Sequence, residues 1–80
     1  MEITGKTAEI YEFIVDYVSE HLYSPTIREI GKGVDLKSTS SVYAYMQRLI
    51  NAGLIRMNFA EPRTIQLIGY KIIKDNEKEL

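Results

Sequence analysis

A helical pattern of apolar positions dominates the first quarter of the chain. Apolar residues recur there at spacings of three and four, which is typical of a helix that buries one face. Thr4 precedes this segment and provides an N-cap. The pattern therefore predicts a helix over residues 5 to 22 whose inward stripe consists of Ile10, Phe13, Ile14, Tyr17, Val18 and Leu22.

A second, shorter helix is predicted after Pro25, because the residue before a proline is pushed out of the helical region. Thr26 and Glu29 have the spacing of a capping box, in which each side chain accepts a hydrogen bond from the other residue's amide. These signals predict a helix over residues 27 to 33. Gly31 in its interior indicates a close approach by another backbone.

A tight turn and a third helix come next. The turn covers residues 34 to 37, where Asp35 can adopt the left-handed backbone that such a turn needs. Ser38 caps a helix predicted over residues 39 to 52, and Gly53 ends it. The inward stripe of this helix again has helical spacing and consists of Val42, Met46, Leu49 and Ile50.

The apolar period changes to two after residue 53, which indicates strands. We expect one strand near residues 54 to 58 and another near 64 to 69, forming a hairpin that is stable only against the helices. The fold class is therefore α+β: a winged helix-turn-helix domain over residues 1 to 69, with residues 70 to 80 as a C-terminal extension. The apolar stretch from Tyr70 to Ile73 is a candidate dimer interface.

The composition excludes several classes of function. The 80 residues form one small domain, and the absence of cysteine removes disulfides, thiolate metal sites and cysteine nucleophiles. A single histidine, His21, offers no metal or relay cluster, and no nucleophile–base pair or phosphate-cradling glycine loop is present. We therefore expect a cytoplasmic domain that is not an enzyme and has no cofactor, no metal, no small-molecule substrate and no membrane contact.

The net charge of −1 conceals an asymmetry along the chain. Residues 1 to 36 carry three cations against seven anions, whereas residues 37 to 74 carry six cations against one anion. A basic half is the footprint of a surface that binds a polyanion. Lysines and arginines also solvate ordinary exposed faces, so charge alone leaves both interpretations open.

The order of elements favours DNA binding without requiring it. In a helix-turn-helix the second helix of the motif enters the major groove, here the segment starting at Thr39. Winged helices also serve as protein–protein interaction modules. The six tyrosines, the net negative charge and the neutral face of the third helix fit that alternative.

Several segments resemble one known family, the amino-terminal DNA-binding domain of LexA-type SOS repressors. The resemblance extends from Thr4 to Ile68. It rests chiefly on Ser24 to Gly31 (S-P-T-I-R-E-I-G) and Ala52 to Arg56 (A-G-L-I-R), supported by Glu9 to Tyr11, Ser38 to Val42 and Pro62-Arg63. It implies a transcriptional repressor module that binds double-stranded operator DNA, as a homodimer with one half-site per domain.

Two departures limit what the resemblance implies. Asp35 stands where such domains usually carry glycine. LexA-type repressors also have a second domain, a self-cleaving serine–lysine protease that makes the dimer, and these 80 residues contain none of it. The resemblance therefore extends to DNA binding and not to cleavage or its inducer.

The resemblance places base contacts in the first half of the third helix. Recognition helices contact base edges chiefly through such amino-terminal residues. Serine hydroxyls can bond to any base, and Ala44 can touch a thymine methyl, whereas the two tyrosines could instead cover the core. The expected set is Ser40, Ser41, Tyr43, Ala44 and Tyr45.

Phosphate contacts are expected at the starts of the two motif helices, at Arg48 further along the third helix, and in the wing. Free amides and the helix dipole favour a phosphate at the start of the third helix. Arg63 is the best single candidate for a phosphate or minor-groove contact in the wing. The expected set is Thr26, Arg28, Lys37, Ser38, Thr39, Arg48 and Arg63.

Overall fold

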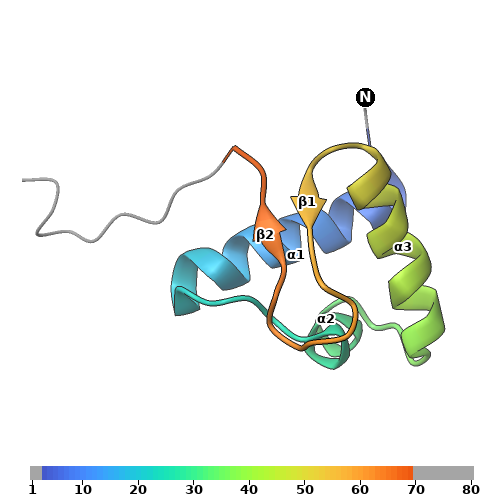
Figure 1. Cartoon of the computed structure of the whole chain (residues 1–80). Coiled ribbons are helices and arrows are strands. Elements are labelled where there is room, and N and C mark those ends of the chain that lie inside the picture. The colour runs from blue at the N-terminus through green and yellow to red at the C-terminus, as the bar shows by residue number, and fades with distance from the viewer. Residues whose placement is uncertain (1–2, 70–80) are drawn as a thin grey trace, which may run out of the picture.

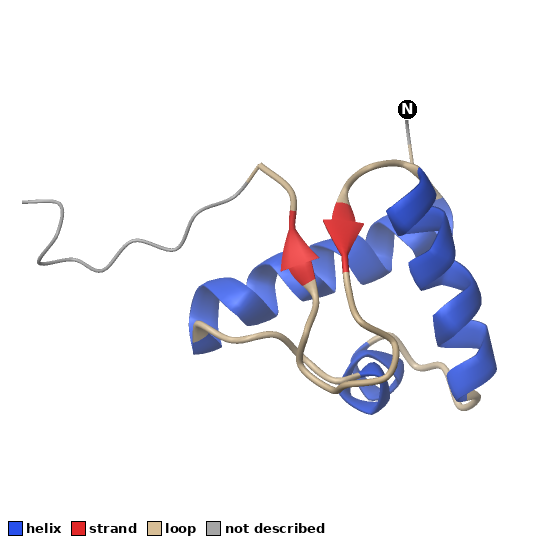
Figure 2. Cartoon of the chain, in the orientation of Figure 1, coloured by secondary structure: helices blue, strands red, loops and turns tan. Residues whose placement is uncertain are grey.

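The computed structural model describes residues 3–69 and has the winged helix-turn-helix order predicted from the sequence (Figure 1). Three helices precede a two-stranded antiparallel sheet (Figure 2). The candidate interface at Tyr70 to Ile73 lies outside the described residues. The elements are α1 (Gly5–His21), α2 (Ile27–Gly33), α3 (Thr39–Asn51), β1 (Ile55–Arg56) and β2 (Gln66–Leu67).

The sheet lies across α1, with α3 at one side and α2 beside the loop that joins the two strands (Figure 1). Ile55 pairs with Leu67 and Arg56 with Gln66. The ladder is thus only two residues long on each strand, shorter than the predicted strands. A hairpin this short depends on its packing against the helices.

The end of α1 corrects two predictions. Tyr17 is half-buried but does not pack against the core, because its ring stacks on that of His21 with the centroids 4.0 Å apart. Leu22 is not part of the inward stripe: it is the C-cap, with φ of 65°, and its side chain is 57% exposed. Its amide donates to the carbonyl of Val18, which closes the last turn of the helix. The left-handed C-cap turns the chain off the helical path, so the spacing that placed Leu22 on the stripe no longer applies.

The predicted capping box of α2 is confirmed. The amide of Glu29 donates to Thr26 Oγ1 over 3.1 Å, and the amide of Thr26 donates to Glu29 Oε1 over 2.8 Å. By contrast, Thr4 and Ser38 occupy the N-cap positions of α1 and α3, but neither side chain accepts a capping hydrogen bond. Local sequence therefore fixes the start of α2 more firmly than the starts of the longer helices.

The turn between α2 and α3 is tight for the reasons expected. A Cβ on Gly31 would lie 3.0 Å from the carbonyl oxygen of Leu36, which confirms the close approach predicted at this glycine. The Leu36 amide also donates to the Gly31 carbonyl over 2.7 Å. Asp35 has φ of 61°, the left-handed conformation that favours glycine.

One hydrophobic core joins all three helices to the sheet. The predicted stripes supply most of it, and Val34, from the turn after α2, adds a buried side chain that no periodicity indicated. None of the described helices is long and apolar enough to cross a membrane. The buried apolar residues are Ile10, Ile14, Ile30, Val34, Val42, Met46, Leu49, Ile55 and Ile65.

Candidate nucleic-acid interface

The outward face of α3 consists of small and polar side chains. A helix turns roughly 100° per residue, so the positions opposite the buried stripe of α3 share one side. All of them are exposed, and two belong to the predicted base-contacting set. The face comprises Ser40, Ala44, Gln47, Arg48 and Asn51.

The base contacts predicted from the sequence do not include Gln47 and Asn51, which also lie on the outward face of α3. Gln47 Nε2 donates to Asn51 Oδ1 over 3.1 Å, so the two amides are already oriented along the outward face. Both are side chains that can bond to adenine in the major groove. Their position opposite the buried stripe is the signal that could have found them.

The three remaining candidates lie at the edges of this face. Tyr43 is 39% exposed and leans toward the wing. Tyr45 and Ser41 are half-buried, and Tyr45 packs against the core. The guanidinium carbon of Arg48 lies 5.4 Å from the centroid of the Tyr45 ring. The structure therefore brings Ser40 and Ala44 to the centre of the face and leaves the other three at its borders.

Cationic side chains surround the start of α3. Arg28 on α2 and Lys37 in the turn are both exposed and line an open groove of about 550 Å³ between the two helices. Thr39 lines the same groove, and Lys32 and Asp35 contribute one charge of each sign. Arg28, Lys37 and Thr39 thus share one surface with a net positive charge.

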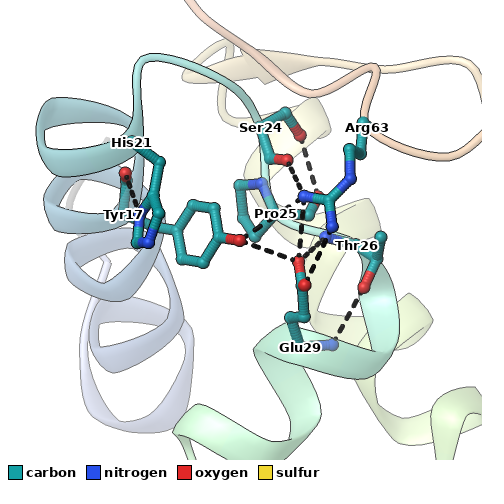
Figure 3. Close-up of polar contacts among 7 residues, drawn as sticks. All are labelled: Tyr17, His21, Ser24, Pro25, Thr26, Glu29 and Arg63. Carbon is teal, nitrogen blue, oxygen red and sulfur yellow. Dashed lines mark hydrogen bonds and ion pairs between the residues drawn. The ribbon is translucent and has the colours of Figure 1, made fainter.

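Arg63 makes the most extensive set of contacts among the predicted site residues (Figure 3). Its Nη2 donates to Glu29 Oε2 over 2.9 Å, and its Nη1 donates to the carbonyl of Ser24 over 2.9 Å. The guanidinium carbon also lies 4.9 Å from the centroid of the Tyr23 ring. Arg63 therefore fastens the wing to the junction of α1 and α2, and its contact with phosphate stays a prediction.

Glu29 is the acceptor at the centre of this network. The Thr26 amide and then the Arg63 guanidinium lower the pKa of Glu29 from 4.5 to about 2. Tyr17 contributes a further hydrogen bond from its hydroxyl to Glu29 Oε1, over 3.2 Å. The carboxylate is therefore ionised throughout the neutral range and serves the capping box and the wing at once.

The wing loop is closed by its own polar side chains. The Asn58 amide donates to Thr64 Oγ1 over 2.9 Å, and the Thr64 hydroxyl donates back to the Asn58 carbonyl over 2.9 Å. Asn58 Oδ1 accepts from the amide of Ala60 over 2.9 Å. A buried serine, Ser24, adds a contact at the base of the wing, since its Oγ accepts from the Ile65 amide over 3.1 Å. The wing is thus held in a defined position.

No group of three or more histidine, aspartate or glutamate side chains within residues 3–69 could hold a metal ion. The outward face of α3 and the groove beside its start offer hydrogen bonding, apolar contact and charge. These are the interactions by which proteins contact base edges and phosphates.

Comparisons with known proteins agree with this geometry. A family model described as the LexA DNA binding domain matches residues 1–64. The chain is 47% identical to the LexA repressor of Clostridium novyi (strain NT) over 68 residues, which are 85% of this chain and 33% of the relative.

Two further relatives are also similar over most of this chain but over only about a third of their own length. The LexA repressor of Lacticaseibacillus casei (strain BL23) is 48% identical over 59 residues, covering 74% of this chain and 28% of the relative. That of Listeria innocua serovar 6a is 43% identical over 69 residues, covering 86% of this chain and 34% of the relative. The chain thus spans about a third of the length of the curated relatives that it matches.

Proposed function

This chain belongs to the LexA DNA-binding domain family, and on that premise we propose that it is the operator-reading module of a transcriptional repressor. It binds a specific site on double-stranded DNA with α3 in the major groove, and it represses transcription by occupying that site. The observation that carries the proposal is the outward face of α3, whose small and polar side chains lie opposite the buried stripe.

In this proposal the first half of α3 reads the bases. Ser40 and Ala44 lie at the centre of the outward face and approach the base edges most closely. Ser41, Tyr43 and Tyr45 contact bases at its borders. Hydroxyl groups bond to more than one base, and Ala44 favours a thymine methyl group. The protein therefore prefers some bases over others at each position, and no single residue specifies a single base.

The phosphate contacts then set the register of α3 on the duplex. Arg28, Lys37, Ser38 and Thr39 contact one strand around the start of α3, because all four are exposed and three of them, Arg28, Lys37 and Thr39, line one groove. The remaining proposed contacts have a second structural role. Thr26 caps α2, Arg48 lies near Tyr45, and Arg63 holds the wing while keeping 41% of its side chain exposed.

Two domains are needed for useful affinity, because one module covers one half-site. We propose a homodimer on a palindromic operator, located in the cytoplasm with the chromosome. Four to six phosphate contacts by one domain on one half-site give a log–log dependence of affinity on salt with a slope of roughly −4 to −5.

The test is selection of binding sites from random duplexes, followed by measurement of affinity by fluorescence anisotropy as a function of salt. We expect a symmetric sequence to be enriched and Ser40→Ala to weaken or broaden the preference. The matched control is Ser19→Ala, which removes an exposed hydroxyl from α1. Failure to enrich any sequence, with an affinity that does not respond to salt, would favour the protein–protein module instead.

A further inference from the structure

Two exposed aromatic side chains meet where the recognition helix faces the wing. Tyr43 comes from α3 and Phe59 from the loop between β1 and β2, and their ring centroids lie 5.4 Å apart. The side chains are 39% and 45% exposed, respectively, so much of each ring faces solvent. Large exposed apolar side chains that pack together on a surface mark a contact with a partner more often than isolated ones do.

The wing presents Phe59 from a fixed backbone. Its preceding neighbour Asn58 is bonded through its amide to Thr64, and its following neighbour Ala60 donates to the Asn58 side chain. The ion pair between Arg63 and Glu29 fastens the same loop to α2. A side chain held in this way loses little conformational entropy when it binds.

The surroundings of the pair identify the class of partner. Arg28 and Thr39, two of the proposed phosphate contacts, line an open groove of about 330 Å³ together with Tyr43 and Phe59. Glu61 lines the same groove, and its carboxylate accepts a hydrogen bond from Asn58 Nδ2 over 3.1 Å. An apolar ring surface beside a cation and a helix N-terminus matches a nucleotide, in which the carbon edge of the deoxyribose or a thymine methyl group lies near a charged phosphate. A purely apolar partner would leave Arg28 unpaired.

We propose that Phe59 contacts the apolar edge of a nucleotide, a thymine methyl group or a deoxyribose, beside the bases read by Tyr43. This inference rests on the proposed function and adds to it a specificity-determining residue in the wing. Phenylalanine contacts thymine methyl groups in the major groove and acts as an apolar wedge in the minor groove.

The test uses the full 80-residue chain and the duplex selected with it. Phe59→Ala is compared with Leu22→Ala, which removes a side chain that is 57% exposed at the far end of α1. We expect Phe59→Ala to weaken binding roughly tenfold and Leu22→Ala to change it less than twofold. Circular dichroism and thermal melting establish that both variants remain folded.

A set of duplexes with single thymine-to-uracil changes then distinguishes the two contacts. If Phe59 contacts a methyl group, one uracil weakens the unchanged chain and leaves Phe59→Ala unaffected. If it contacts a deoxyribose, every uracil duplex affects both proteins equally, while the loss caused by Phe59→Ala persists. Equal affinities of Phe59→Ala and Leu22→Ala would overturn the inference while leaving the proposed function intact. Failure of the unchanged chain to select any duplex would overturn both.

Discussion

Replacing Glu29 by glutamine tests the network that positions the wing. The carboxylate accepts hydrogen bonds from the Thr26 amide over 2.8 Å and from Arg63 over 2.9 and 3.2 Å. Glutamine retains the size of the side chain and one acceptor oxygen but removes the charge. We therefore expect Glu29→Gln to destabilise the domain at neutral pH without changing its fold.

The magnitude follows from the pKa of Glu29, which lies at about 2 in the folded chain against 4.5 ordinarily. At about 1.4 kcal/mol per pKa unit this difference sets an upper bound of about 3 kcal/mol, and the 37% exposure of the side chain reduces it to about 1 kcal/mol through solvent screening. Because folding lowers this pKa, the stabilisation is present above pH 4.5 and is lost as the pH falls toward 2.

The assay is urea denaturation monitored by circular dichroism at a series of pH values from 7 to 2. The matched control is Glu9→Gln, whose carboxylate is paired with Lys6 over 3.1 Å but is 52% exposed. We expect the control to lose less than about 0.5 kcal/mol at any pH. If Glu29→Gln resembled the control at pH 7, or if its deficit did not shrink below pH 4.5, this account of Glu29 would be refuted.

Substitutions at three further positions test the packing of the motif by thermal or urea denaturation. Ile30→Ala removes a fully buried side chain and should cost about 2–5 kcal/mol, and a loss below about 1 kcal/mol would contradict the central place of Ile30 in the core. Gly31→Ala should cost about 1–3 kcal/mol because the new Cβ would lie 3.0 Å from the Leu36 carbonyl oxygen, and an unchanged melting temperature would show that the turn can yield. Asp35→Gly should be neutral or stabilising by up to about 1 kcal/mol, since φ is 61° there, whereas Asp35→Ala should not stabilise.

Short-range signals in the sequence were sufficient to predict most of the fold. The capping box at Thr26 and Glu29 and the glycine at position 31 predicted α2 and its turn, because each depends on contacts within a few residues. The stripe of α1 was wrong at Leu22, where a left-handed C-cap replaces the last helical residue, and at Tyr17, whose ring stacks on His21 instead of packing against the core. Helical periodicity contains no information on such a cap.

The site was less predictable because its organising contacts join distant segments. Arg63 and Glu29 are 34 residues apart, and nothing in the local sequence indicates that the wing's arginine turns toward α2. Phe59 has no periodic partner in the sequence, and its place beside Tyr43 depends on how the hairpin packs against α3. Residue type and helix position could suggest Ser40 and Ala44, but only the packing of the helices separates them from half-buried Tyr45.

The most direct test of the central claim is to block the outward face of α3 with a negative charge. Ala44→Glu introduces a carboxylate at an exposed position and favours the helix nearly as well as alanine, so the domain should remain folded. Affinity for the selected duplex is measured by fluorescence anisotropy alongside Ser19→Glu, which places the same charge on α1. We expect Ala44→Glu to lose affinity roughly a hundredfold or more, because the carboxylate prevents base contact and repels the phosphates, and Ser19→Glu to lose less than about threefold. Equal binding by the two variants would contradict the assignment of α3 as the DNA-reading helix.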